Sequence, residues 1–131
     1  FFTRAFVYVS MGKSPIQAFE MGLEKMPTAS KISESIKKGI ESKSDNTKDT
    51  ISRFGQMCSL DGALPSAVHL IAKYENNLKE ALIENILAGG DSSARGMVAG
   101  FILGCYQGLS KLPEDWFKDM VAYDKINSLM S

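Results

Sequence analysis

Residues that mark disulfide-rich, zinc-binding or membrane-spanning proteins are scarce in this sequence. The 131 residues include two cysteines, one histidine and one tryptophan. Two cysteines are too few for a disulfide framework, and a single histidine without cysteines at ligand spacing supports no zinc site. Every apolar stretch is interrupted within a few residues, so no segment is long enough to cross a bilayer as a helix. These shortages exclude a disulfide scaffold, a zinc protein and a membrane-spanning chain.

The chain also lacks a net charge. Fifteen Lys and Arg residues balance fifteen Asp and Glu residues, so the chain as a whole is drawn neither to nucleic acid nor to an anionic membrane. The hydrophobic fraction of 44% and the charged fraction of 23% are those of a globular protein. A wholly disordered chain is therefore excluded, and the length suits one domain.

The cysteines and the first residues bear on the cellular context. Cys58 and Cys105 lie among apolar residues, and we expect them to be reduced, buried thiols of a cytoplasmic protein. The chain begins at Phe1, without an initiator methionine or the layout of a signal peptide. We expect it to be a piece of a longer protein.

Apolar residues recur at helical spacing along most of the chain. Ser14, Pro15 and Gln17 form the N-cap, first-turn proline and capping-box pattern of one helix start. Pro65 predicts the start of another helix. Residues 1–9 suit either a strand or a helix, because aromatic and β-branched side chains also fit helical spacing there. No alternating strand pattern follows, so we predict an all-α protein.

One polar stretch interrupts the helical pattern. Residues 41–49 are polar and rich in turn formers, which predicts a mobile loop. With no clear internal repeat, residues 1–131 are expected to form a single all-α domain around this loop.

Two single-copy side chains have structural interpretations. His69 shares the polar side of its expected helix with Ser66 and Lys73, which predicts an exposed imidazole. Trp116 follows Pro113 near the start of the last helical segment and is expected to anchor that segment on the core.

Residues 88–108 are rich in glycine and other small residues. Gly89 and Gly90 predict a flexible turn between two helices, and Asp91 then starts the second helix as a capping residue. Glycine recurs at every fourth position after this start, at Gly96, Gly100, Gly104 and Gly108. Each glycine costs ~1 kcal/mol in a helix interior. The stripe therefore predicts a central helix that a neighbouring backbone approaches very closely.

Asp91 permits two interpretations. The common one is a helix N-cap and nothing more. In the other, Asp91 is a metal ligand, because carboxylate and hydroxyl oxygens at a helix start are hard donors that suit Mg²⁺ or Ca²⁺. One carboxylate is too few for a site, so further ligands would come from elsewhere in the fold.

An ordered set of motifs in this chain resembles the C-terminal signature of the ADP-ribosylglycohydrolase superfamily. The motifs are Gly89-Gly90-Asp91, then Gly104-Cys105-Tyr106-Gln107-Gly108 at the end of the small-residue helix, then Leu112-Pro113-Glu114-Asp115-Trp116. Residues 61–67 and the helix through Glu80 fit the same layout. The resemblance is good over residues 46–120 and looser before them. It implies the C-terminal half of an all-α orthogonal helical bundle.

The resemblance also implies a magnesium site. Members of the family typically bind two Mg²⁺ ions, and two acids and a hydroxyl that follow the paired glycines contact these metals. Asp91 matches the first acid and Ser92 the threonine between the acids. Ser93 stands where the second acid belongs, and Ala94 where the second hydroxyl belongs. The implied metal ligands are Asp91 and, as a weak replacement, Ser93, because losing an anionic ligand weakens Mg²⁺ binding.

The ligand contacts implied by the resemblance lie on the same stretch. Gly89, Gly90, Ser92 and Arg95 are the candidate substrate-binding residues, and no catalytic residue is assigned in this chain. Arg95 has two interpretations: its guanidinium could hold a diphosphate, or it could form a surface or structural salt bridge. An arginine four residues after the acid resembles the branch that contains the J-type lens crystallins.

The resemblance leaves two functions open. The full-length protein is expected to hydrolyse an ADP-ribosyl glycosidic bond with Mg²⁺, in an ADP-ribose-containing small molecule or an ADP-ribosylated protein. The alternative is a catalytically degenerate, crystallin-like homologue that is structural or binds ADP-ribose. If half of the fold lies outside this chain, apolar helix faces should be exposed, to be covered by self-association or by an N-terminal half. Nucleic acid and membranes are not expected as partners.

Overall fold

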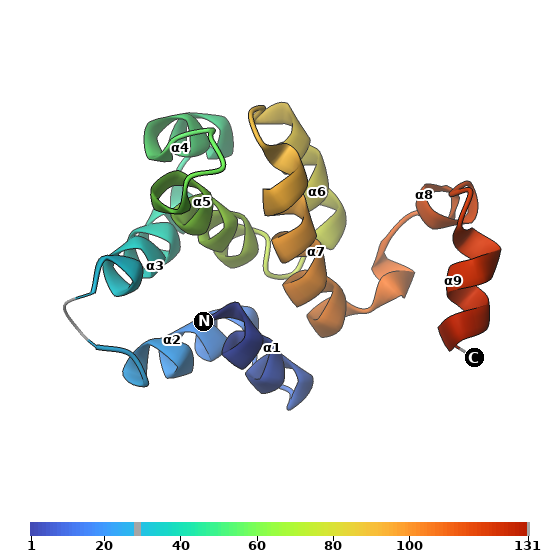
Figure 1. Cartoon of the computed structure of the whole chain (residues 1–131), viewed down its shortest axis with the longest axis horizontal. Helices are drawn as coiled ribbons and strands as arrows, with labels where there is room; N and C mark the ends of the chain where they lie inside the picture. The colour runs from blue at the N-terminus through green and yellow to red at the C-terminus, as the bar shows by residue number, and fades with distance from the viewer. Residues whose placement is uncertain (28–29, 131) are drawn as a thin grey trace.

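The computed structural model describes residues 1–27 and 30–130, and every regular element in these residues is helical (Figure 1). The elements are α1 (Phe2–Ser10), α2 (Pro15–Glu24), α3 (Lys31–Glu41), the 3₁₀ helix η1 (Ser42–Ser44), α4 (Thr47–Phe54), α5 (Leu60–Lys73), α6 (Leu78–Leu87), α7 (Ser92–Gln107), the 3₁₀ helix η2 (Leu109–Lys111), α8 (Glu114–Lys118) and α9 (Tyr123–Met130). The predicted all-α class is confirmed. None of the helices in the described ranges is long and apolar enough to cross a membrane.

The first segment, which suited either strand or helix, is the helix α1. Ala5 and Val9 are buried along one side of it, a spacing of four residues that places them on one helical face. The Phe6 ring stacks on Phe101 of α7, with 4.2 Å between the ring centroids. The aromatic residues of the segment therefore serve helix packing.

Helix α5 is the centre of the core, and α3, α4 and α7 pack around it. Helix α3 packs closely on α5 at Gly39, where an added Cβ would lie 2.7 Å from both the Pro65 carbonyl oxygen and the Val68 Cβ. The prediction that this helix starts at Pro65 is wrong, because it starts at Leu60 and has Pro65 inside it. Gly62 permits the longer helix, since its missing side chain leaves room for the Gly55 carbonyl oxygen, 2.8 Å from where a Cβ would stand.

The polar residues 41–49 are mostly helical, since they include the end of α3, all of η1 and the start of α4. Some of their polar groups point inward, where Ser42 and Thr47 flank the imidazole of His69. The mobility of this segment stays a prediction.

The prediction that His69 is exposed is wrong, because its side chain is fully buried. The Ser42 hydroxyl donates to the Gly39 carbonyl oxygen and lies 2.8 Å from His69 Nδ1, and Thr47 Oγ1 lies 3.2 Å from Nε2. Because Ser42 uses its proton on Gly39, the imidazole donates from Nδ1 to Ser42 and accepts at Nε2 from Thr47. Burial, reinforced by the charge of Lys73, lowers the pKa of His69 to about 4.

The glycine stripe of α7 is only partly explained by close packing. Helix α7 is central, since α1, α5 and α6 all contact it. A Cβ at Gly96 would stand 2.8 Å from the Asn85 side chain, but one at Gly104 would meet no atom within 4 Å. Gly108 lies beyond the helix, with a φ of 80°. The predicted close approach of a neighbouring backbone is therefore wrong, because the atoms nearest to a Cβ at Gly96 belong to a side chain.

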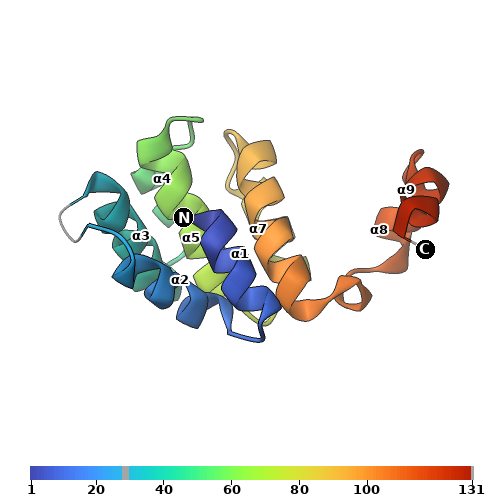
Figure 2. The same ribbon diagram turned by 60° about the horizontal axis from the view of Figure 1, so that its bottom comes forward.

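The C-terminal elements η2, α8 and α9 project from the helical body as an arm (Figure 2). Trp116 is 40% exposed, and α8 has no buried residue. The prediction that Trp116 anchors this segment on the core is therefore wrong. Cys58 and Cys105 are also exposed, against the expectation of buried thiols. Apolar neighbours in sequence do not bury a thiol when it lies in a connection or on an outer helix face.

Candidate functional site

The candidate site is the turn between α6 and α7, at the end of these helices that lies beside the connection from α4 to α5 (Figures 1 and 2). Gly89 and Gly90 both have positive φ angles, 71° and 68°. Side chains disfavour this left-handed conformation, so the paired glycines allow the chain to reverse within two residues. The predicted turn between two helices is confirmed, its flexibility stays a prediction, and hydrogen bonds hold it from two sides.

Gln56 holds the outer side of the turn. The N–H of Asp91 donates to the Gln56 carbonyl oxygen (2.8 Å), and Gln56 Nε2 donates to the Ala88 carbonyl oxygen (2.6 Å). At Gly90 a Cβ would overlap the backbone carbonyl of Gln56. The connection before α5 and the turn before α7 are thus packed backbone against backbone.

Arg95 and Asn85 hold the inner side. Arg95 Nη2 donates to the Gly89 carbonyl oxygen, and Arg95 Nε donates to Asn85 Oδ1 (3.1 Å). Asn85 Nδ2 in turn donates to the Ser92 carbonyl oxygen (2.8 Å). Arg95 is only 2% exposed, and burial lowers its pKa, an effect that the charge of Asp91 partly opposes.

The interpretation of Arg95 as a surface or structural salt bridge is wrong, because its side chain is buried and pairs with no described acid. The ion pairs found among the described side chains do not include Arg95, whose hydrogen bonds go to the neutral oxygens of Asn85 and Gly89. Arg95 therefore supports the turn from beneath. Its role as a ligand contact stays a prediction.

Asp91 is the N-cap of α7, as the first interpretation predicted. Its Oδ1 accepts from the N–H of Ala94 at 3.3 Å. Asp91 and Ser92 are half-buried and Ser93 is exposed, so the predicted carboxylate and hydroxyl ligands stand together at the helix start. The first N–H groups of an α-helix have no intrahelical partner, and the helix dipole makes this end attractive to anions.

The oxygen donors at this turn do not make a cation site by themselves. Asp91 supplies one carboxylate, of which one oxygen caps the helix, and Ser93 supplies a neutral hydroxyl. Across residues 1–27 and 30–130, no three or more His, Cys, Asp or Glu side chains gather in a group that could hold a metal ion. The donors suit Mg²⁺ in kind, because they are hard oxygens, but a complete site needs ligands from outside the described chain.

Sequence analysis missed Gln56 and Asn85. Gln56 lies more than thirty positions from the turn that it contacts, and no local pattern shows such a pairing. Asn85 offered a weak indication, because a polar residue inside the apolar stretch of α6 needs a hydrogen-bonding partner when it is buried.

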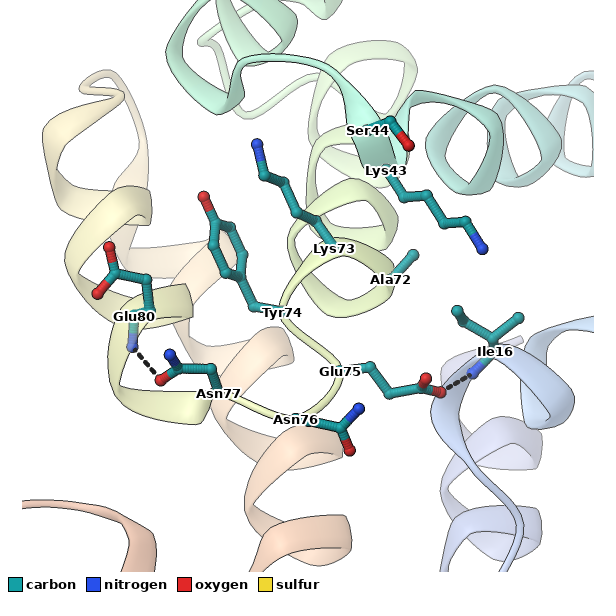
Figure 3. Close-up of a pocket in the computed structure, with 10 residues that line it drawn as sticks. All are labelled: Ile16, Lys43, Ser44, Ala72, Lys73, Tyr74, Glu75, Asn76, Asn77 and Glu80. Atoms are coloured by element: carbon teal, nitrogen blue, oxygen red, sulfur yellow. Dashed lines mark hydrogen bonds between the residues drawn. The ribbon is translucent and has the colours of Figure 1, made fainter.

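A hollow of about 560 Å³ lies at the opposite end of α6 from the candidate site (Figure 3). Several of its polar side chains are engaged in holding the fold. Glu75 accepts from the N–H of Ile16 (3.0 Å), and Lys73 Nζ donates to the Asp45 carbonyl oxygen (2.5 Å). The Tyr74 hydroxyl lies 2.8 Å from Thr47 Oγ1, and burial raises the pKa of Tyr74. We therefore regard this hollow as a structural joint.

Comparison with known sequences establishes the family to which this all-α fold and this turn belong. The sequence model of ADP-ribosylglycohydrolases matches residues 2–131, and the chain belongs to this family. It is similar to the ADP-ribosylhydrolase ARH3 of Bos taurus, with 26% identity over 130 residues that cover 92% of this chain. Identity is also 26% with the human ARH3, over 127 residues, and 25% with that of Mus musculus, over 130 residues.

These alignments cover only part of the relatives. The chain spans 35% of the bovine and human proteins and 34% of the mouse protein, against 92% and 89% of its own length. No solved structure matches the chain.

Proposed function

We propose that the full-length protein hydrolyses an ADP-ribosyl glycosidic bond, and that this chain supplies one wall of the site. Family membership and the similarity to proteins named ADP-ribosylhydrolases support the proposal. The observation that carries it is the ordered turn from Gly89 to Ser93, which presents a carboxylate, two hydroxyls and a helix N-terminus together. ADP-ribose carries a diphosphate and ribose hydroxyls, and these groups suit such a surface.

The turn suggests how the ligand contacts divide among its residues. Gly89 and Gly90 have no side chains, so a ligand can approach their backbone closely. The Ser92 hydroxyl lies beside the helix N-terminus, where it can donate to a ribose or phosphate oxygen. Arg95 lies beneath Gly89 and adds positive charge behind these groups.

Asp91 and Ser93 are the residues of this chain that would hold Mg²⁺, with further ligands from the rest of the protein. Bound Mg²⁺ would orient the ribose hydroxyls and position a water molecule. Asp91 is presented for this role by its cap bond to Ala94, which fixes one carboxylate oxygen and leaves the other for a cation. Ser93 contributes no negative charge, so we expect a weakened metal site.

The turn carries a single acid, with Ser93 where the family has a second one. This missing negative charge supports an alternative, a catalytically degenerate, crystallin-like homologue that binds ADP-ribose or is purely structural. Isothermal titration of the full-length protein with Mg²⁺, with and without ADP-ribose, separates these functions. Hydrolysis assays on Arg-, Ser- and acetyl-linked ADP-ribose then follow. Metal-dependent binding with hydrolysis supports the enzyme. Binding without hydrolysis supports the degenerate homologue, and no binding of either ligand leaves a structural role.

A matched pair of variants tests the assignment of Asp91. Asp91→Asn keeps an oxygen that can cap the helix and removes the charge, and we expect Mg²⁺ binding to weaken by at least about tenfold. Asp49 is an exposed acid near the start of another helix, in the first turn of α4. Asp49→Asn should leave Mg²⁺ binding unchanged. Equal effects of the two substitutions on Mg²⁺ binding would contradict the assignment of Asp91 as a metal ligand.

Self-association, or packing against the remainder of the protein, is proposed for the exposed apolar side chains. Met97 and Phe101 of α7 are 72% and 52% exposed, and Leu129 on the arm is 80% exposed. Light scattering of the 131-residue chain should show an oligomer. A stable monomer that binds no hydrophobic dye would contradict this expectation.

A further inference from the structure

Gln56 is the residue that joins the candidate site to a second, distant segment of the chain. Its backbone carbonyl accepts from the N–H of Asp91 (2.8 Å), and its side-chain amide donates to the Ala88 carbonyl oxygen (2.6 Å). The two bonds bracket the turn, because Ala88 ends α6 and Asp91 starts α7. Gln56 itself belongs to the connection between α4 and α5.

The contact leaves the turn little freedom on that side. No Cβ could be accommodated at Gly90, because Gln56 occupies the space, and Gln56 Nε2 lies 3.5 Å from where a Cβ of Gly89 would stand. On the other side, Arg95 donates to the Gly89 carbonyl oxygen. The Gly89 peptide is therefore held between Arg95 beneath it and Gln56 outside it.

These two supports differ in what they do for the fold. Arg95 is buried and is part of the packing between α6 and α7. Gln56 is exposed as a residue, and the hydrogen bond of its side chain goes to the turn. Its side chain therefore contributes little to the core and acts mainly on the direction in which the turn presents Asp91.

We propose that Gln56 is a positioning residue for the ligand-binding turn. Its side chain fixes the Ala88 carbonyl and so sets the direction of the Asp91 carboxylate and of the first N–H groups of α7. The inference rests on the proposed function, since it assigns Gln56 a role in binding ADP-ribose through that turn. A displacement of about 1 Å in such groups is enough to lower binding and catalysis strongly.

The test uses two substitutions at Gln56 and a matched control in the full-length protein. Gln56→Ala removes the side chain, and Gln56→Glu keeps its size but removes the donor to Ala88. Gln107→Ala is the control, because the Gln107 side chain, like that of Gln56, bonds to backbone: it accepts from the N–H of Leu78 (3.0 Å) and donates to the Glu75 carbonyl oxygen (2.8 Å). These bonds lie at the other end of α6, away from the turn.

Two readouts are compared: the affinity for ADP-ribose by calorimetry, and hydrogen–deuterium exchange of the peptide containing residues 89–95. We expect both Gln56 variants to accelerate exchange in this peptide about 5- to 10-fold and to weaken ADP-ribose binding by about tenfold. Gln107→Ala should change neither readout, although it loses two side-chain bonds to backbone and Gln56→Ala loses one.

Each other outcome overturns a particular step. Unchanged exchange in the Gln56 variants would show that the side chain does not order the turn. Faster exchange with unchanged affinity, or an equal loss of affinity in Gln107→Ala, would overturn the positioning role. If wild type binds no ADP-ribose with or without Mg²⁺, the proposed function fails, and the exchange data still decide whether Gln56 orders the turn.

Discussion

Replacing Gly90 by alanine tests whether the turn is held as tightly as the structure indicates. Gly90 has a φ of 68°, and an alanine in this left-handed conformation costs about 1–2 kcal/mol. Its Cβ would also overlap the backbone carbonyl of Gln56, so the two segments must separate. Overpacking of this kind adds about 1–3 kcal/mol. We therefore expect Gly90→Ala to lower the free energy of unfolding by about 2–5 kcal/mol.

Gly104 provides the matched control. It lies inside α7, and a Cβ there would meet nothing within 4 Å. Alanine is favoured over glycine in a helix interior by about 1 kcal/mol, so Gly104→Ala should stabilise the protein by about that amount. The same chemical change is thus expected to have opposite signs at the two positions.

Urea unfolding followed by circular dichroism at the helical signal measures both differences, and thermal unfolding supports them. At about 4 °C per kcal/mol for a chain of this size, the two variants should differ by about 12–24 °C in Tm. A Gly90→Ala variant within about 0.5 kcal/mol of wild type would refute the close packing of Gln56 on the turn. Destabilisation by Gly104→Ala would refute the open space beside α7.

Three further outcomes are expected. Because folding lowers the pKa of His69 from 6.5 to about 4, the unfolded chain takes up this proton at a higher pH than the folded chain. The free energy of unfolding should therefore fall by about 3 kcal/mol, relative to His69→Gln, as the pH drops from 6.5 to 4. Urea unfolding at several pH values measures this fall, and parallel curves for the two proteins would contradict it. Ser93→Asp places a second acid two residues after Asp91 and should strengthen Mg²⁺ binding at least tenfold in calorimetry of the full-length protein; no change would mean that Ser93 does not face the cation. Cys58 and Cys105 should both react rapidly with a thiol reagent under native conditions, since both are exposed; reaction only after unfolding would show that they are covered.

Local patterns predicted the parts of this protein that depend on neighbours in sequence. The capping box at Ser14 and Gln17 forms as expected, because both partners lie within one helical turn. Asp91 caps α7 for the same reason. The paired glycines predicted the turn, since few other residues accept two successive positive φ angles.

Predictions failed where the outcome depended on distant segments. His69 looked exposed on its own helix, but Ser42 and Thr47 arrive from η1 and α4 to satisfy both ring nitrogens. Once both nitrogens have partners, burying a neutral imidazole costs little. Trp116 was expected to pack inward, and the arm that carries it leaves the helical body instead.

The sequence by itself determined the helical class, the turn at Gly89 and Gly90 and the position of Asp91 at the start of α7. These features follow from side-chain periodicity, backbone freedom and capping, which act over a few residues. Only the tertiary structure decided that Gln56 holds this turn from outside and that Arg95 is buried beneath it. Those contacts depend on how α4, α5, α6 and α7 pack, and packing brings together groups that no local pattern connects.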